Sequence, residues 1–403
     1  MPELTGRRIW FAGIGGAGLS AYAVLAKAWG ADVAGWDRAE TPYLVHVRAA
    51  GIDVVVAPEP AETPEGWEVV TSTAFAARVP GRSRAEFLAE LVALRRSIVV
   101  AGAHGKTTTT AMIAFCLDRL GRDPAFLIGG EVPQLGGNAR AGSGWLVVEG
   151  DESDRTIAAL RPEIAVITNI DLDHHSTFAS RAEVGQLFSE WLRHVPHVVR
   201  GDELKPAGRV ELALPGAHNR RNAACALAAL ELAGVGRAEA AAALGDFGGV
   251  GRRFELRGTA AGVSVYDDYA HNPAKVEALV SAARERTDGG RVLIAFQPHL
   301  YSRTRHLARE LAAGLAAADA VCVTEVYPAR EAPVTGVSGK LVVDAVAELR
   351  PGMPLGWMPS LEDAAAFVAR RARAGDLVLT VGAGDVDRVA PLVLQSLSAA
   401  GRG

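Results

Sequence analysis

Two glycine-rich segments contain the residue types that hold phosphate groups in proteins. The first matches G-x-G-x-x-G through Gly13, Gly15, Gly16 and Gly18, between a short apolar run and an Ala/Leu-rich run. Such glycines let the backbone approach a diphosphate, which rests on the N–H groups that open a helix. Asp37 ends the next expected strand, where dinucleotide folds bind a ribose. This pattern alone predicts either NAD or a nucleotide-sugar diphosphate, and a tight turn without a ligand is the alternative.

The second segment predicts a phosphate site more strongly, because a lysine and a threonine follow its glycines. It comes after the β-branched run 97–100 and opens a helix-forming stretch. Its backbone N–H groups can cradle phosphates, Lys106 can reach the β- and γ-phosphates, and the Thr107 hydroxyl can bind magnesium. The first glycine of the standard eight-residue Walker pattern would fall at Val100, so the loop is a variant. The loop residues expected to bind phosphate are Gly102, Ala103, His104, Gly105, Lys106, Thr107 and Thr108.

Carboxylates follow two further expected strands. Residues 149–154 hold four acidic side chains, beginning with Glu149, and residues 168–175 end in Asp173, His174 and His175. A solvated acidic loop is the ordinary meaning of such a run. Beside a phosphate loop, however, a carboxylate at a strand end is a plausible magnesium ligand. The two histidines do not make a zinc site, since no third ligand has suitable spacing.

Composition narrows the class of protein. The chain has 403 residues, 42 Lys and Arg against 46 Asp and Glu, and a formal net charge of −4, which argues against nucleic acid or an anionic membrane as partner. Cys116, Cys225 and Cys322 are too far apart for metal-ligand or disulfide patterns, which favours a reducing compartment. The uncharged run 9–26 follows two arginines, as in a secretory signal, but its glycines make a poor apolar helix. We therefore expect a cytoplasmic protein.

Strand and helix patterns alternate along the chain, which predicts parallel sheets covered by helices. A helical pattern near 85–95 leads into a new β-branched strand at 97–100, and the glycine-rich segment 248–251 marks a second joint. These joints divide the chain into domains at 1–95, 96–253 and 254–403. The expected fold class is α/β, with a Rossmann-like N-terminal domain, a central P-loop ATPase-like parallel-sheet domain and a C-terminal Rossmann-like domain.

Taken together, the motifs resemble those of the Mur ligases, ATP-dependent enzymes that form amide bonds in peptidoglycan precursor synthesis. The matching segments span nearly the whole chain in the family's order: Gly13–Ser20, Ala101–Thr110, Glu149–Asp154, Thr168–His174, Gly216–Asn219 with Asn222, Gly249–Phe254, Asp267–Pro273, Phe296–Thr304, Tyr327–Pro333 and Gly382–Asp385. The variants Glu-x-Asp-Glu-Ser-Asp and Asp-Asp-Tyr-x-His-x-Pro favour the member that adds alanine.

The resemblance implies a role for each matching position. Lys106 and Thr107 would hold the ATP phosphates and magnesium, and Glu149 and His174 would bind a second magnesium. The remaining contacts to ATP would come from His218, Asn219, Asn222, Arg253 and Asp268. The first glycine loop would bind a UDP-sugar rather than NAD, through Gly13, Gly15, Gly16, Gly18, Ser20, Asp37 and Ser72. Tyr269, His271, His299 and Arg303 would line the amino-acid end, with Lys106, Glu149, His174 and Arg303 as the catalytic set.

The resemblance also implies the reaction. ATP would activate the carboxylate of UDP-N-acetylmuramate as an acyl phosphate, L-alanine would attack it, and ADP and phosphate would leave, in a monomer or weak homodimer. The murein tripeptide recycling ligase and the folate polyglutamate enzyme are alternatives within the family. An NAD(P)-dependent oxidoreductase and a P-loop kinase or NTPase are alternatives from other classes. The first leaves Lys106 unexplained, and the second leaves the C-terminal motifs unexplained.

Three departures from the family pattern bear on these roles. Leu300 stands where the family usually has arginine, so an amino-acid carboxylate clamp must depend on Arg303 or Arg305. The segment 196–216 is shorter than the family leads us to expect. No lysine lies between His174 and Arg200 to serve as the carbamylated lysine of other Mur ligases, which agrees with an alanine-adding member.

Overall fold

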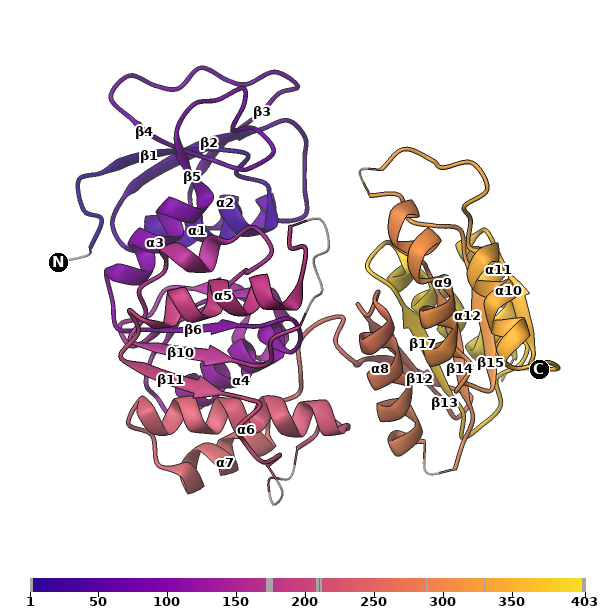
Figure 1. The fold of residues 1–403 in the computed structure, drawn as a ribbon. Coiled ribbons are helices and arrows are strands. Elements are labelled where there is room, and N and C mark those ends of the chain that lie inside the picture. Colours follow the sequence, from indigo (N-terminus) through magenta and orange to yellow (C-terminus); the bar gives the residue numbers. More distant parts are fainter. Residues whose placement is uncertain are drawn as a thin grey trace. The chain divides into compact units, whose positions relative to one another are not determined.

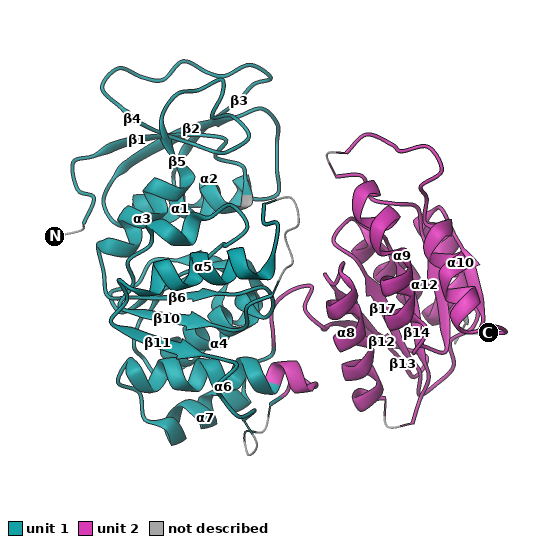
Figure 2. Ribbon diagram, viewed as in Figure 1, with its two compact units in different colours: residues 1–212, 220–248 teal, residues 213–219, 249–403 magenta. Residues whose placement is uncertain are grey.

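The computed structural model describes residues 3–171, 177–207, 210, 212–287, 289–329 and 331–400. The chain divides into two compact units, residues 1–212 with 220–248 (unit 1) and residues 213–219 with 249–403 (unit 2), as Figure 2 shows. Within the described residues, every helix is too short or too polar to cross a bilayer.

Unit 1 contains two sheets (Figure 1). The first is entirely parallel, in the order β3-β2-β1-β4-β5. Its elements in chain order are β1(Arg8–Ala12), α1(Ala17–Ala28), β2(Asp32–Asp37), α2(Leu44–Ala49), β3(Asp53–Val56), β4(Glu68–Thr71), β5(Arg82–Ser83) and α3(Arg84–Ala93). The chain leaves β1 toward β2 and β3 and returns on the other side at β4. The carboxyl ends of β1 and β4 therefore flank a point where the strand order reverses, which is where open α/β sheets bind ligands.

The second sheet of unit 1 has the order β11-β10-β6-β9-β7-β8, and among its described strands only β7 and β8 pair in antiparallel fashion. Its elements are β6(Ser97–Ala101), α4(Lys106–Arg119), β7(Ala125–Val132), η1(Pro133–Leu135), β8(Gly137–Arg140), β9(Leu146–Glu149), η2(Thr156–Ala159), β10(Ile164–Ile167), α5(Arg181–Leu192), β11(His197–Arg200), α6(Ala217–Leu232) and α7(Arg237–Gly245). The central strand β6 reads Ser-Ile-Val-Val-Ala and is buried throughout. A strand covered on both faces needs such a continuous apolar run.

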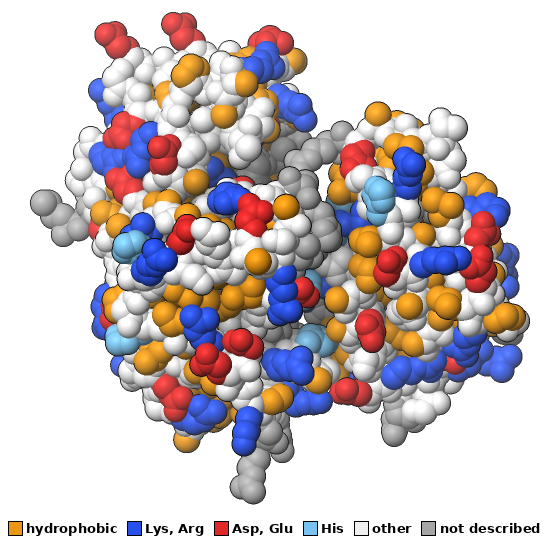
Figure 3. All heavy atoms as spheres, viewed as in Figure 1, with side chains coloured by type: hydrophobic (Ala, Val, Ile, Leu, Met, Phe, Trp, Pro, Cys, Tyr) orange, Lys and Arg blue, Asp and Glu red, His pale blue; other side chains and the backbone are white. Residues whose placement is uncertain are grey.

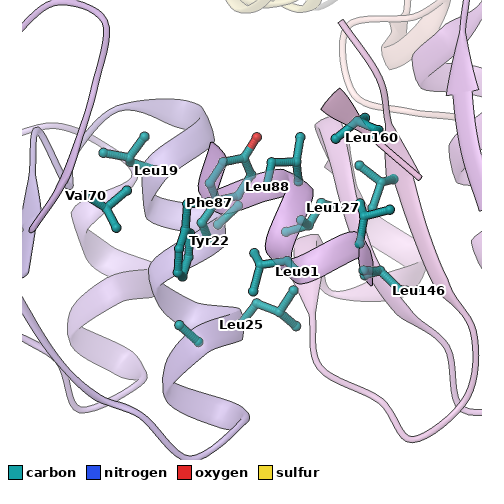
Figure 4. Close-up of a cluster of buried hydrophobic side chains, with 14 of the residues drawn as sticks. Leu19, Tyr22, Leu25, Val70, Phe87, Leu88, Leu91, Leu127, Leu146 and Leu160 are labelled. Atoms are coloured by element: carbon teal, nitrogen blue, oxygen red, sulfur yellow. The ribbon is translucent and has the colours of Figure 1, made fainter. Parts of the chain in front are cut away.

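One hydrophobic core joins the two sheets of unit 1. Helix α3 presents Phe87, Leu88 and Leu91, which lie between α1 and the second sheet (Figure 4). The helix begins with a capping box, in which the Ser83 hydroxyl accepts the Glu86 N–H and the Glu86 carboxylate accepts the Ser83 N–H. That cap satisfies donors that would otherwise be left open at the helix start. The same cluster also contains Leu25 of α1 and Leu146 of β9, so the two sheets share apolar packing.

Unit 2 is built on one sheet in the order β12-β13-β17-β14-β15-β16, with only β12 and β13 antiparallel among the described strands. Its elements are β12(Glu255–Ala260), β13(Val263–Asp268), α8(Pro273–Arg286), β14(Val292–Phe296), α9(Tyr301–Leu315), β15(Ala320–Val323), α10(Lys340–Leu349), β16(Leu355–Trp357), α11(Leu361–Ala369), β17(Leu377–Val381), η3(Val386–Arg388) and α12(Val389–Ala400). Separate apolar clusters fill its two faces. The parallel strands β13, β17, β14 and β15 bring their carboxyl ends to one edge.

The α/β class is confirmed, with three sheets of largely parallel strands alternating with helices. The signal-like run 9–26 forms most of β1 and α1, where Ile9, Phe11 and Leu25 are fully buried. The joint expected at 95/96 falls between the two sheets of unit 1, and the joint expected at 253/254 lies close to the unit boundary at 248/249.

Candidate functional site

The first glycine loop is held by Asp37. The N–H of Gly15 donates to the Asp37 Oδ2 at 2.8 Å, and the Thr41 hydroxyl donates to the Gly15 carbonyl at 2.8 Å. A Cβ placed on Gly15 would lie 2.9 Å from both side-chain oxygens, so residue 15 must be glycine for this packing. The structure thus gives Asp37 a loop-fixing role in addition to the ligand contact expected from sequence. A side chain introduced at position 15 would point toward Asp37 and Thr41.

Ser72 faces the same loop from the end of β4. Its hydroxyl is buried and, among the described residues, has no hydrogen-bond partner. A Cβ on Gly13, whose φ is +90°, would come within 2.5 Å of that hydroxyl. Ser20 is also buried, and its N–H donates to Gly16. The expected UDP-sugar residues Gly13, Ser20 and Ser72 therefore gather at the strand-order reversal of the first sheet.

Arg84 connects this loop with the acidic segment of the second sheet. Its guanidinium lies 3.3 Å from a Cβ placed on Gly18, and its Nη2 donates to Asp154 Oδ2 at 2.5 Å. Burial raises the pKa of the neighbouring Tyr22 phenol to about 12, although the Arg84 charge acts in the opposite direction. Arg84 thus links the first glycine loop to the acidic segment that follows β9.

The second glycine loop connects β6 to α4, and residues after β10 fix its shape. The His104 N–H donates to the Asn169 Oδ1 at 3.0 Å, and the Asn169 amide donates back to the His104 carbonyl at 2.8 Å. The Thr168 hydroxyl donates to the same carbonyl at 2.6 Å. Gly102 and Gly105 have φ of +130° and +83°, and added side chains there would meet Thr168 and Asn222. The loop therefore needs glycine at both positions.

Lys106 and Thr107 open α4 and both contact acidic residues. The Lys106 Nζ donates to the Gly102 carbonyl at 2.7 Å and to the two Glu152 carboxylate oxygens at 2.8 and 3.1 Å. Burial is the largest single influence on Lys106 and disfavours its charged form, but the charge and hydrogen bond of Glu152, together with the charges of Glu149 and Asp151, outweigh burial, so the pKa of Lys106 is raised. The Thr107 hydroxyl donates to Glu149 Oε1 at 3.0 Å, and the Gly129 N–H donates to Glu149 Oε2 at 2.8 Å.

Thr107 and Glu149 form a donor set that fits magnesium. Thr107 lies at the start of α4, just after the phosphate loop, and Glu149 ends the strand β9 that pairs with β6. The Thr107 hydroxyl and the Glu149 carboxylate are within hydrogen-bonding distance, and both supply oxygen atoms, which magnesium prefers as ligands. His174, expected to share a second magnesium with Glu149, lies outside the described residues, as do Asp173 and His175.

Three of the residues expected to contact ATP, which are His218, Asn219 and Asn222, lie in the first two turns of α6. Asn219 and Asn222 are buried, and the Asn219 amide donates to the Pro215 carbonyl at 2.7 Å. Asn222 packs against the backbone of Gly105 in the phosphate loop. His218 lies one turn before Asn222 on the same helix.

In unit 2, an arginine and two aspartates link the start of the unit to the ends of β13 and β17. Arg252 donates from Nε to Asp267 at 2.9 Å and from its other nitrogens to the carbonyls of Gly382 and Gly384. Asp267 is fully buried and also accepts the Thr380 hydroxyl. The Asp268 carboxylate accepts the N–H groups of Phe254 and Ala270, both at 2.7 Å, and burial raises its pKa.

Four of the residues expected at the amino-acid end lie together in unit 2. The rings of Tyr269 and His271 are 5.4 Å apart, and those of His271 and His299 are 5.7 Å apart. Arg303 Nη1 is 3.4 Å from His299 Nδ1, and the Arg253 guanidinium lies over the Tyr269 ring at 5.2 Å. Arg303 is half-buried and Arg305 is exposed, so Arg303 is the better placed of the two expected carboxylate clamps.

Several residues of this arrangement lie outside the predicted site set. Glu152, Asn169 and Arg252 contact the expected loops, and Tyr327 stacks on His299 at 5.9 Å. Gln297 donates to Asp385 at 2.8 Å across the ends of β14 and β17. All except Arg252 lie at or shortly after the carboxyl end of a parallel strand. This position, where α/β sheets bind ligands, is the sequence feature that could have identified them.

Leu300 has a positive φ of +70° and precedes α9. Its N–H donates to the Tyr327 carbonyl at 2.9 Å, so the backbone at 300 ties the ends of β14 and β15 together. Whatever its side chain, this residue has a local structural role.

The surface shows no broad basic area on the visible face. In Figure 3, lysine and arginine side chains alternate with aspartate and glutamate over both units. This mixture agrees with the formal net charge of −4.

Three family models match successive parts of the chain: "Mur ligase family, catalytic domain" over residues 8–96, "Mur ligase middle domain" over 100–204 and "Mur ligase, glutamate ligase domain" over 252–384. The chain belongs to the Mur ligase family. The resemblance inferred from the motifs is therefore confirmed.

Among its relatives, the UDP-N-acetylmuramate–L-alanine ligase of Rubrobacter xylanophilus is 39% identical, covering 97% of this chain and 100% of that protein. The enzyme of the same name from Renibacterium salmoninarum is 38% identical over 97% of this chain and 96% of its own. The first alignment spans 446 positions and thus exceeds this chain, so that relative contains residues absent here.

Solved structures agree with the fold. The UDP-N-acetylmuramate–alanine ligase of Thermotoga maritima matches with a TM-score of 0.79 and 27% identity, over 98% of this chain and 99% of that one. A murein peptide ligase from Psychrobacter arcticus matches with a TM-score of 0.63 and 23% identity, over 98% and 99% of the two chains, and supports the fold alone.

Proposed function

We propose that this protein ligates L-alanine to the carboxylate of UDP-N-acetylmuramate, using ATP and releasing ADP and phosphate. The observation that carries the proposal is 39% identity to a UDP-N-acetylmuramate–L-alanine ligase over that protein's entire length. The alternative of an NAD(P)-dependent oxidoreductase is not supported, because the relatives are ligases throughout. The same match favours the alanine ligase over the murein tripeptide recycling ligase.

The phosphate loop supplies the first half of the chemistry. A carboxylate is a poor acyl donor until one of its oxygens becomes a good leaving group, and phosphorylation by ATP achieves this. The N–H groups around Gly105 and the ammonium of Lys106 would bind the transferring phosphate and offset its repulsion from the substrate carboxylate. His218, Asn219, Asn222, Arg253 and Asp268 are proposed to hold the rest of ATP.

Unit 2 supplies groups for the second half, in which the amine of alanine attacks the acyl phosphate. Arg303 can pair with the carboxylate of the amino acid and aim its amine. His271 Nδ1 is 2.8 Å from the Tyr269 carbonyl, which only accepts, so that nitrogen bears the proton and Nε2 is an acceptor. His299 and Tyr269 would line the same end.

Magnesium belongs to the proposal at two positions. Thr107 would help to hold one ion beside the ATP phosphates, and Glu149 and His174 would hold a second. When bound, the metal would neutralise charge on the phosphates and the substrate carboxylate. A change of Glu149 to Gln should raise the magnesium concentration needed for half-maximal activity, because it removes a ligand charge. Glu163→Gln, which changes an acid paired with Arg96, is the control. Equal magnesium curves for both variants would refute the assignment.

The first glycine loop is proposed to bind the UDP diphosphate through residues 13–18, with Ser20, Asp37 and Ser72. We further propose three domains, 1–95, 96–253 and 254–403, and a monomer or weak homodimer acting in the cytoplasm. The three reduced, buried cysteines support that location.

The experiment that tests the function is an ADP-release screen over the common amino acids with UDP-N-acetylmuramate present. We expect L-alanine to give the highest kcat/KM, and the Lys106→Ala variant to lose at least about 100-fold in turnover. Calorimetry with UDP-N-acetylmuramate and with NAD is the companion measurement. Saturable NAD binding without a UDP-sugar signal, or ADP release only with a tripeptide, would overturn the proposal.

A further inference from the structure

Glu152 is the most deeply buried acidic residue of the segment that follows β9. It is 3% exposed, whereas Asp151 and Ser153 beside it are half-buried. Both of its carboxylate oxygens lie against the Lys106 Nζ, at 2.8 and 3.1 Å. A buried carboxylate is costly unless positive charge compensates it, and Lys106 forms an ion pair with Glu152.

The contacts of Lys106 restrict where its ammonium group can point. An ammonium has three N–H donors. One donates to the Gly102 carbonyl at 2.7 Å, and the Glu152 carboxylate engages at least one more. The ammonium group is therefore held between the Gly102 carbonyl and the Glu152 carboxylate, with at most one N–H left for a phosphate.

The energetics favour retention of this pair when ATP binds. Removal of one partner from a buried ion pair is strongly destabilising, because it takes away a charge that compensates the other. If Lys106 left Glu152 for the nucleotide, the carboxylate would face the phosphates without the charge of Lys106. Keeping the pair avoids this repulsion and leaves the remaining N–H of Lys106 for the phosphate.

We propose that Glu152 is a positioning residue, which acts through Lys106 by holding its ammonium group in the orientation that meets the transferring phosphate. This inference rests on the proposed ATP site. Glu152 itself does not touch ATP, and its effect should vanish when Lys106 is absent.

The first test separates affinity from turnover. Glu152→Gln keeps the side-chain shape and one acceptor oxygen but loses the charge, so Lys106 becomes less well oriented. We expect kcat to fall about tenfold or more while the KM for ATP changes less than twofold, since misplacement of a catalytic group acts mainly on the transition state. A kcat within twofold of the wild type would refute the proposal.

The second test is a double-mutant cycle on direct ATP binding in the presence of MgCl2. Lys106→Ala removes the positive charge of Lys106 from beside Glu152 and the phosphates, and ATP affinity should drop sharply. Adding Glu152→Gln to that variant should restore part of the affinity, although the same change in the wild type has little effect. This coupling is the signature of one residue acting through the other. Equal effects of Glu152→Gln in both backgrounds would refute it.

Asp151→Asn is the matched control, because it neutralises the adjacent carboxylate, which accepts the Ser153 N–H. Its coupling to Lys106→Ala should be much smaller than that of Glu152→Gln, and equal couplings would count against the proposal. Thermal melts accompany the cycle: Lys106→Ala should lower the melting temperature and the double variant should regain it. The binding cycle does not need UDP-N-acetylmuramate or alanine, so it can fail while the proposed ligase activity stands, and the reverse also holds.

Discussion

The surroundings of His271 lower the pKa of its side chain. Burial, followed by the charges of Lys275 and Arg303, lowers the pKa of its imidazole to about 3. The ordinary value in an unfolded chain is about 6.5. Between these two values the unfolded protein binds a proton that the folded protein does not. The contribution of His271 to stability is therefore present in full above about pH 6.5 and is lost as the pH falls toward 3.

We predict that the free energy of unfolding decreases by about 2 kcal/mol between pH 7 and pH 5 on account of this residue, at 1.36 kcal/mol per unit of pH. His271→Asn keeps a donor for the Tyr269 carbonyl but does not titrate, so it should remove this part of the slope. Urea unfolding at the two pH values measures the effect. His306→Asn, at an exposed position of α9, is the control and should keep the wild-type slope. Identical slopes for the two variants would contradict the prediction.

The residues proposed to bind phosphate stand out in the sequence, whereas their partners do not. Lys106 and Thr107 follow two glycines within one short segment, and this spacing predicts a phosphate loop. Glu152 lies 46 positions away, in a run of acids that reads equally well as a solvated loop. Only the parallel pairing of β6 with β9 brings it to Lys106.

At the scale of elements, the buried central strands were predictable because they are continuous apolar runs, as in β6 and β14. The edge strands β8 and β12 were not. The short strand β8 (Gly-Asn-Ala-Arg) and the strand β12 (Glu-Leu-Arg-Gly-Thr-Ala) contain glycine and polar residues and lie at sheet margins. Such strands form because a neighbour offers hydrogen bonds, which a local pattern does not reveal.

The loop between β1 and α1 leads to a prediction about Gly15. Gly15→Ala should destabilise the protein by about 1–3 kcal/mol, because the new methyl group would press on Asp37 and Thr41 at 2.9 Å and disturb both hydrogen bonds to residue 15. It should also weaken UDP-N-acetylmuramate binding. Thermal melts and calorimetry measure the two effects.

Gly16→Ala is the control for stability in the same loop. Its methyl group would approach only the Gly13 carbonyl, at 3.4 Å, and Gly16 is exposed. We expect its melting temperature to stay close to that of the wild type. Equal losses for the two variants would show that the contact with Asp37 does not set the requirement for glycine.

Arg252 and Arg253 are neighbours with different expected roles. Arg252 joins Asp267 to the loop after β17, so Arg252→Gln should cost roughly 2–4 kcal/mol by leaving the fully buried Asp267 without its cation. Arg253 lies over the Tyr269 ring, so Arg253→Gln should lower the melting temperature much less and act chiefly on ATP affinity. Chemical denaturation and ATP titration of both variants test this division. A larger stability loss for Arg253→Gln would reverse the assignment.

At the scale of the whole molecule, the reactivity of the three cysteines can be used to follow the unfolding of each unit. Cys116 and Cys225 lie in unit 1 and Cys322 in unit 2, and each is no more than 2% exposed. Burial raises the pKa of their thiols to about 12, 11 and 12, respectively. Since the thiolate is the reactive form, the native protein should not react with iodoacetamide at pH 8. Ala238→Cys, at an exposed position of α7, provides a thiol that should react at once.

Urea should then expose these thiols unit by unit. The two sheets of unit 1 share one apolar core, in which α3 joins α1 to the second sheet, so unit 1 should unfold as one cooperative body. Cys116 on α4 and Cys225 on α6 should therefore become reactive at the same urea concentration, while Cys322 follows the separate core of unit 2 with its own midpoint. Mass spectrometry of labelled peptides along a urea series measures all three at once. Different midpoints for Cys116 and Cys225 would show that unit 1 does not unfold as one body, even though one apolar cluster spans both of its sheets.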